Sequence, residues 1–101
     1  MFKKFEQLLT YETDWIREIA AALINIKINY RIHLINPDIL IFSWGKHYIE
    51  IYSNVPFTDK RRASKNRFWF VHIYKSSNNK APQDYLCKEI KEVITSLKGL
   101  K

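Results

Sequence analysis

Five basic residues lie close together in the second half of the chain and have the chemistry of a phosphate-binding segment. They are Lys60, Arg61, Arg62, Lys65 and Arg67. Binding to a nucleic-acid backbone needs several cations at close spacing, because the affinity comes from neutralising phosphates and releasing their counterions. Residues 56–80, which include Lys75, hold seven bases against Asp59 alone and so carry +6 of the chain's net +7. This local charge predicts a surface that binds an anionic partner.

Aromatic residues overlap the end of this basic stretch. Residues 67–75 read Arg-Phe-Trp-Phe-Val-His-Ile-Tyr-Lys, an aromatic and β-branched run that predicts a strand, and residues 47–53 predict the strand before it. Side chains alternate between the two faces of a sheet. One face is therefore expected to carry the core residues Ile49, Ile51, Trp69, Val71 and Ile73. The other is expected to carry Tyr48, Phe68, Phe70 and Tyr74.

Aromatic side chains on an uncovered sheet face beside cations are suited to stacking single-stranded nucleic acid. The run Phe68-Trp69-Phe70-Val71 after Arg67 resembles part of the second signature of RNA-recognition-motif domains, and this resemblance implies RNA binding by the aromatic face. The resemblance covers about one strand, lacks both glycines of the signature and stands in a different order of elements, so it assigns no family. The alternative is that a helix or a dimer partner covers these aromatics, since large aromatic side chains are usually buried.

A second set of residues on the same expected face has the chemistry of acid–base catalysis. Glu50, His72, Arg31 and His33 would supply an acid, a base and a cation around a phosphate, as in a small metal-independent ribonuclease. Their grouping depends on strand register, because a slip of one residue moves a side chain to the opposite face. Pro37-Asp38 followed by Glu50 resembles the outline of a PD-(D/E)XK nuclease, but Tyr52 stands where that family has a lysine, so such a magnesium site would be incomplete. The single cysteine, Cys87, excludes an intrachain disulfide, and neither a metal nor a cofactor is expected.

The elements that position these residues follow from the hydrophobic pattern. Apolar residues between positions 5 and 23 recur at steps of three and four, which predicts one long helix or two short ones, with Thr13 or Asp14 as a cap. Residues 26–34 alternate and predict a strand, which a turn at residues 36–38 ends. Residues 39–44 predict a buried strand, and a tight turn at Gly45 joins it to the next. Trp15 and Trp44 are expected in the core.

The C-terminal stretch predicts a helix that begins near Pro82, with Asn78 or Asn79 as its cap. Its apolar stripe would contain Leu86, Ile90, Val93, Ile94 and Leu97. The length and the order of elements predict one α+β domain over residues 1–101. It would have an N-terminal helix or two, a four-stranded antiparallel sheet and a C-terminal helix, with the helices on one face of the sheet.

These observations favour a small, basic, non-enzymatic binding module for RNA or DNA, with an accessory or regulatory role. The alternative is a stoichiometric inhibitor of the anti-defence or immunity type that docks its basic surface on an acidic or nucleic-acid-binding protein; a homodimer also remains open. The abundance of Ile, Lys, Asn, Tyr and Phe indicates an AT-rich genome, such as that of a phage or mobile element. The basic start is followed by no apolar run, so the expectation is a cytoplasmic protein that does not enter the membrane.

Overall fold

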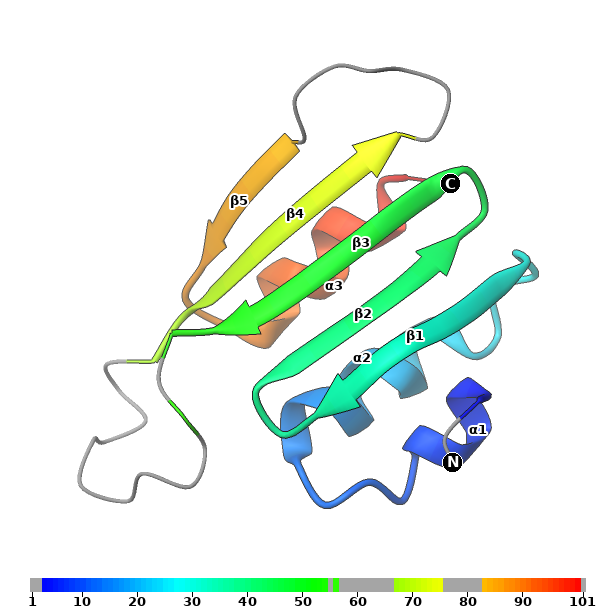
Figure 1. Cartoon of the computed structure of the whole chain (residues 1–101), viewed down its shortest axis with the longest axis horizontal. Helices are drawn as coiled ribbons and strands as arrows, with labels where there is room; N and C mark the ends of the chain where they lie inside the picture. The colour runs from blue at the N-terminus through cyan, green and yellow to red at the C-terminus, as the bar shows by residue number, and fades with distance from the viewer. Residues whose placement is uncertain (1–2, 55, 57–66, 76–82, 101) are drawn as a thin grey trace.

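The fold is α+β, as the sequence predicts. The structure is a computed structural model that describes residues 3–54, 56, 67–75 and 83–100. Two helices precede the sheet and one follows it (Figure 1). In chain order the elements are α1 (Phe5–Leu8), α2 (Asp14–Leu23), β1 (Tyr30–Asn36), β2 (Ile39–Trp44), β3 (His47–Ser53), β4 (Trp69–Lys75), β5 (Gln83–Cys87) and α3 (Ile90–Lys98). Of the two possibilities left open for the N-terminus, the chain adopts two short helices.

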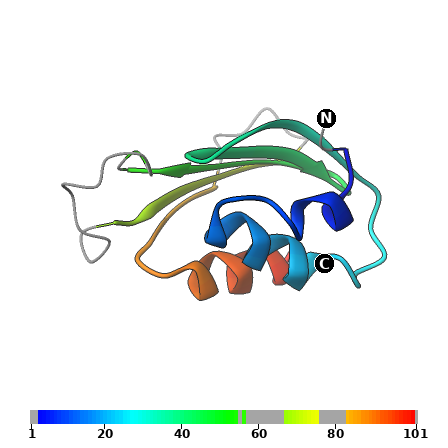
Figure 2. The ribbon, with the colours of Figure 1, turned by 90° about the horizontal axis from the view of Figure 1, so that it is seen from below.

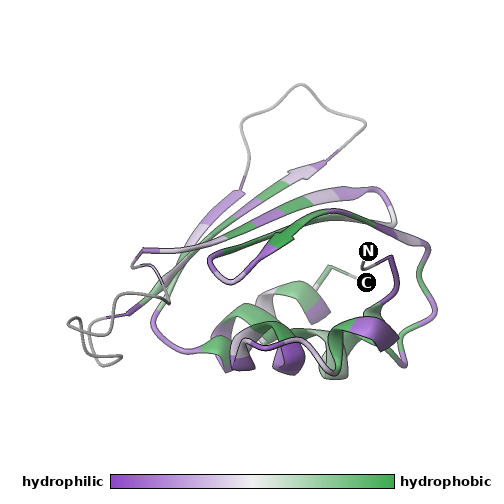
Figure 3. Ribbon diagram, turned by 60° about the horizontal axis from the view of Figure 1, so that its bottom comes forward, coloured by the Kyte–Doolittle hydropathy of each residue, from purple (hydrophilic) through white to green (hydrophobic). Residues whose placement is uncertain are grey.

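The sheet has five antiparallel strands in the order β1-β2-β3-β4-β5, so each strand pairs with its neighbour in sequence. Figure 2 shows the helices together on one side of the sheet, in two layers. Hydrophobic and hydrophilic residues alternate along the ribbons in Figure 3, as expected for elements with one buried side. No helix in the described part of the chain is both long and apolar enough to cross a bilayer.

The core lies between the helices and the face of the sheet that they cover. The residues predicted to form the core side of β3 and β4 are all buried, and they pack with the apolar stripes of α2 and α3. Trp15 and Trp44 are almost fully buried, as predicted. Cys87 is also buried, and burial raises the pKa of its thiol, which leaves it a poor nucleophile.

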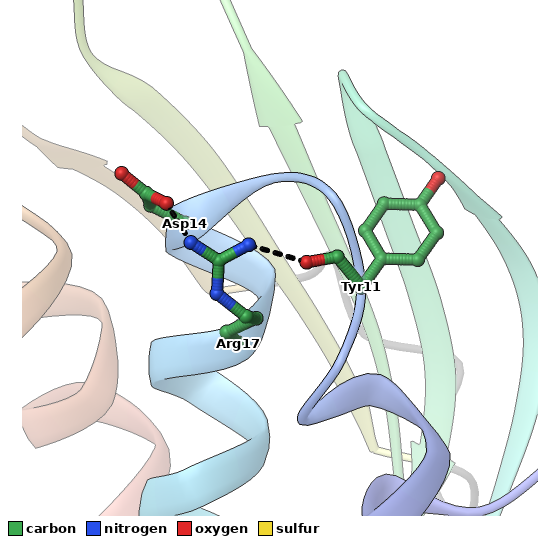
Figure 4. A network of polar contacts seen from close by, with 3 residues as sticks. All are labelled: Tyr11, Asp14 and Arg17. Carbon is green, nitrogen blue, oxygen red and sulfur yellow. Dashed lines mark hydrogen bonds and ion pairs between the residues drawn. The ribbon is translucent and has the colours of Figure 1, made fainter.

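Polar contacts hold the start of α2 in place. Thr13 is the N-cap residue, one of the two positions predicted. The Arg17 guanidinium donates to the Asp14 carboxylate (Figure 4). It also donates to the main-chain oxygen of Tyr11, at 2.5 Å. The Trp15 indole N–H donates to the main-chain oxygen of Pro37 at 2.9 Å. The start of α2 is thereby joined to the connection that precedes it and to the turn between β1 and β2.

A β-bulge in β1 corrects the predicted alternation. The register shifts between Ile32, opposite Phe42, and Leu34, opposite Ile41. A bulge inserts one extra residue, so side chains beyond it change face. Leu34 was expected on the same side as Ile32, but it lies on the opposite face and is 45% exposed. The strand also begins at Tyr30 rather than near residue 26.

The prediction that residues near Pro82 begin the last helix is wrong. Residues 83–87 form β5, which pairs Leu86 with Phe70 and Cys87 with Trp69, and α3 begins only at Ile90. The pairing satisfies main-chain groups along the outer edge of β4, an interaction that local periodicity does not show. The stripe of Ile90, Val93 and Leu97 is buried as predicted, but Leu86 is 58% exposed. Pro82 and the proposed caps lie outside the described residues.

Two leucine-to-alanine substitutions test this correction. Leu97→Ala removes a fully buried side chain and should lower the free energy of unfolding by about 2–5 kcal/mol. Leu86→Ala removes a largely exposed one and should lower it by about 0.5 kcal/mol or less. Urea denaturation monitored by circular dichroism measures both. Equal losses would contradict β5, because a helix through residue 86 would bury Leu86 beside Ile90.

Candidate functional site

The face of the sheet that points away from the helices carries most of the candidate residues. We call it the open face; it includes Arg31 and Leu34 of β1, and its part on β3, β4 and β5 consists of three rows. The rows are Tyr48–Tyr74, Glu50–His72–Asp84 and Tyr52–Phe70–Leu86. In the described part of the chain, no helix lies over this face (Figure 2). The predicted separation of core and aromatic faces on β3 and β4 is therefore correct.

The aromatic rings of the open face are accessible. Tyr48, Phe70 and Tyr74 are 36%, 39% and 36% exposed. Tyr48 and Tyr74 contact edge to face, with ring centroids 5.9 Å apart. Phe68 precedes β4, is half-buried and lies 5.4 Å from the Phe70 ring. The four predicted aromatic residues thus form two contacting pairs, Tyr48 with Tyr74 and Phe68 with Phe70, and the Glu50–His72–Asp84 row separates Phe70 from the tyrosine pair.

The central row contains the ionisable side chains of the open face. His72 Nδ1 lies 2.5 Å from Asp84 Oδ1, across the β4–β5 pair. Glu50 is the cross-strand partner of His72 on the other side, on β3. The Tyr52 ring lies 5.8 Å from the His72 ring. Glu50 is half-buried, while Asp84 is exposed.

Two tyrosine hydroxyls interact with the Glu50 carboxylate. Partial burial, the negative charge of Glu50 and a hydrogen bond donated to Glu50 together raise the pKa of Tyr52. Partial burial and a hydrogen bond donated to the same carboxylate raise the pKa of Tyr74. Both hydroxyls therefore stay protonated around neutral pH and can act as donors to this carboxylate.

The two described cations of the predicted binding set do not lie with the aromatics. Arg67 donates from its guanidinium to Ser53 Oγ at 3.0 Å; burial lowers its pKa, and the charge of Asp38 opposes that shift. Lys75 is the cross-strand partner of His47. It stands two residues after Ile73 and therefore lies on the same face, which the helices cover. It lines a cavity of about 820 Å³ beside α3, together with Lys46 and His47.

The remaining predicted cations, Lys60, Arg61, Arg62 and Lys65, lie outside the described residues. Their segment joins the end of β3 to the start of β4, and Tyr52 and Phe70 are paired at that end of the open face. Arg31 supplies an exposed cation on β1, opposite Ser43.

The structure brings together only part of the predicted ribonuclease set. Glu50 and His72 are direct neighbours, whereas Arg31 and His33 lie on β1, with β2 between them and β3. His33 Nε2 lies 2.6 Å from Ser43 Oγ, and its ring is 5.5 Å from that of Tyr48. Within the described ranges, no group of three or more His, Cys, Asp or Glu side chains is arranged to hold a metal ion.

Sequence reasoning missed Asp84 and Leu86 as members of the open face. Their alternation with Tyr85 is typical of a strand, but the strand has only five residues. The spacing of Leu86 and Ile90 equally fits a helix, which is the structure that the sequence predicts here. Comparison with known protein families, curated proteins and solved structures finds no match to this chain. Function must therefore be argued from the open face itself.

The Tyr52–Glu50 interaction predicts a dependence of stability on alkaline pH. Because folding raises the pKa of Tyr52, the stabilisation is complete below the unfolded pKa of about 10 and is lost as the pH rises through the folded value. We expect the free energy of unfolding to fall above pH 10 less steeply in Tyr52→Phe than in the wild type. Urea denaturation at several pH values from 8 to 11 measures this. Equal slopes would contradict the interaction.

Proposed function

We propose that this protein binds single-stranded nucleic acid, with bases stacked on the open face and phosphates neutralised by the basic segment around Arg61 and Arg62. The observation that carries the proposal is the accessible cluster of Tyr48, Phe70 and Tyr74 on a face that no described helix covers. The role is that of a non-enzymatic accessory or regulatory protein. A cytoplasmic location fits this role.

Stacking supplies the first part of the binding energy. Each base that stacks on an aromatic ring contributes about 1–3 kcal/mol, and the contribution tolerates any base because every base has a π-face. The rings lie on two adjacent strands, and neighbouring strands of a sheet are about 5 Å apart. Bases reach such rings only when they are not paired in a duplex, so the surface favours single strands.

Electrostatic attraction supplies the second part. The chain carries a net charge of +7, most of it within residues 56–80. This segment connects β3 to β4, the two strands that carry the rings, and Arg31 adds a cation on the β1 side. A strand of nucleic acid on the open face would therefore have Arg31 on the β1 side, and the proposal assigns the remaining phosphate contacts to the segment that joins β3 to β4.

Two exposed aliphatic side chains favour a second candidate, the protein inhibitor. Leu34 and Leu86 are 45% and 58% exposed on the open face, on β1 and β5. Aliphatic side chains do not stack bases but do pack in protein interfaces. In this reading the open face docks on an acidic or nucleic-acid-binding protein.

Titration of labelled single- and double-stranded RNA and DNA across a salt series tests the proposal. We expect single strands to bind more tightly than duplexes, with log K falling linearly as log salt rises. No retention of any oligonucleotide at low salt would overturn the proposal and favour the inhibitor. The RNA should be recovered intact; cleavage in EDTA that is lost in His72→Ala would instead favour the ribonuclease.

The stacking surface is tested by a matched pair of tyrosines. Tyr74→Ala removes a ring of the open face and should weaken single-strand binding by about 5- to 150-fold. Tyr85 is similarly exposed, at 39%, but its partner is Val71, on the covered face, so Tyr85→Ala should change the affinity by less than about twofold. Fluorescence anisotropy measures both. Equal losses would place the binding surface elsewhere.

The basic segment is tested by charge reversal. Replacing Arg61 and Arg62 with Glu should lower the slope of log K against log salt by about 1.4, since each phosphate contact on a single strand contributes about 0.7. Replacing the exposed Lys4 and Lys27 with Glu changes the net charge equally and serves as the control. An equal loss of slope in both variants would mean that net charge, not this segment, drives binding.

A further inference from the structure

The central row of the open face raises a difficulty for any nucleic-acid ligand, because Glu50 is an anion among the stacking rings. Tyr48 and Tyr52 flank it along β3, and Phe70 and Tyr74 are its diagonal neighbours on β4. Diagonal neighbours across a strand pair lie about 7–8 Å apart, within reach of aromatic side chains. A carboxylate in this position repels a phosphate. It attracts a base only where the base presents hydrogen-bond donors.

The Glu50 carboxylate has accepting capacity left for a ligand. Two carboxylate oxygens offer about four acceptor positions, and the hydroxyls of Tyr52 and Tyr74 take up at most two of them. Asp84, the other carboxylate of the row, is already in contact with His72 at 2.5 Å. Glu50 lies between Tyr48 and Tyr52 on β3, whereas Asp84 lies on the edge strand β5, so Glu50 is the carboxylate that a base stacked on these rings would meet.

We propose that Glu50 reads the base stacked beside it and selects guanine. This inference rests on the proposed function and adds a base preference to it. Guanine presents two adjacent donors on its Watson–Crick edge, N1–H and the N2 amino group, which match the two oxygens of one carboxylate. Adenine, cytosine and uracil each present a single donor group on that edge. Such paired hydrogen bonds discriminate between bases because the wrong base leaves a polar group unpaired.

The experiment uses eight-residue uridine oligonucleotides with one central position replaced by G, inosine, A or C. We expect the wild type to bind the G oligonucleotide about 5- to 30-fold more tightly than the A and C oligonucleotides. This factor is in the lower part of the range of discrimination known for a side chain that makes two hydrogen bonds to one base. Inosine keeps N1–H but lacks the amino group, so it should fall between G and A. Fluorescence anisotropy at one fixed salt concentration gives all four affinities.

Glu50→Gln separates base reading from binding. The amide keeps the size of the side chain but removes the charge and one acceptor. We expect the preference for G to disappear and the affinity for the all-uridine oligonucleotide to stay the same or rise. Glu18→Gln, an exposed glutamate on α2, should leave the preference unchanged. Thermal unfolding followed by circular dichroism establishes that the variants are folded.

Tyr74→Phe provides a second, independent readout if Glu50→Gln proves unstable. It keeps the ring but removes a hydroxyl that interacts with Glu50, so it should reduce the preference for G while leaving the affinity for uridine within about twofold.

The outcomes separate this inference from the proposed function. Equal binding of all four oligonucleotides by the wild type would overturn base reading and leave nucleic-acid binding in place. A G preference that survives in Glu50→Gln would assign the reading to another residue. No binding of any oligonucleotide would overturn both.

Discussion

The pairing of β3 with β4 holds Ile49 opposite Ile73 and Ile51 opposite Val71, and these four side chains are covered by the helices. Their burial fixes the register, because a slip of one residue would expose all of them. The same register fixes the open face, since Tyr48 must then face Tyr74, and Glu50 must face His72. The core and the candidate site are thus two consequences of a single alignment, and the core supplies the energy that maintains both.

The sequence predicts the most regular parts of this arrangement. Alternation in β3 and β4 is long, aromatic and β-branched, so both faces could be assigned before the structure was known. The bulge at residue 33 has no such signal, because any residue type fits it, and it moves Leu34 to the open face. Residues 83–87 are too few for their alternation to be distinguished from the helical spacing that joins Leu86 to Ile90.

The candidate cations show a different limit. Arg67 and Lys75 flank the aromatics in sequence, and this proximity predicts a shared surface. Strand alternation places Lys75 with Ile73 instead, and Arg67 turns to Ser53 near Asp38. Proximity along the chain is therefore a poor guide to a shared surface within a strand, where neighbours point in opposite directions. The open face itself carries a mixed charge, with Arg31 on the edge strand β1, Glu50 on the central strand β3 and Asp84 on the edge strand β5.

The connection between β3 and β4 has a consequence for how this protein can change. The turns that join β1 to β2 and β2 to β3 are two residues long and set the geometry of their hairpins, with Gly45 at positive φ. The β3–β4 register, in contrast, is held by the strands themselves and their buried side chains. Doubling the length of a long connection costs only about 0.6 kcal/mol of closure entropy. The charge and length of residues 57–66 can therefore diverge among descendants of this chain while the sheet stays constant, so sequence change in this segment is separable from folding.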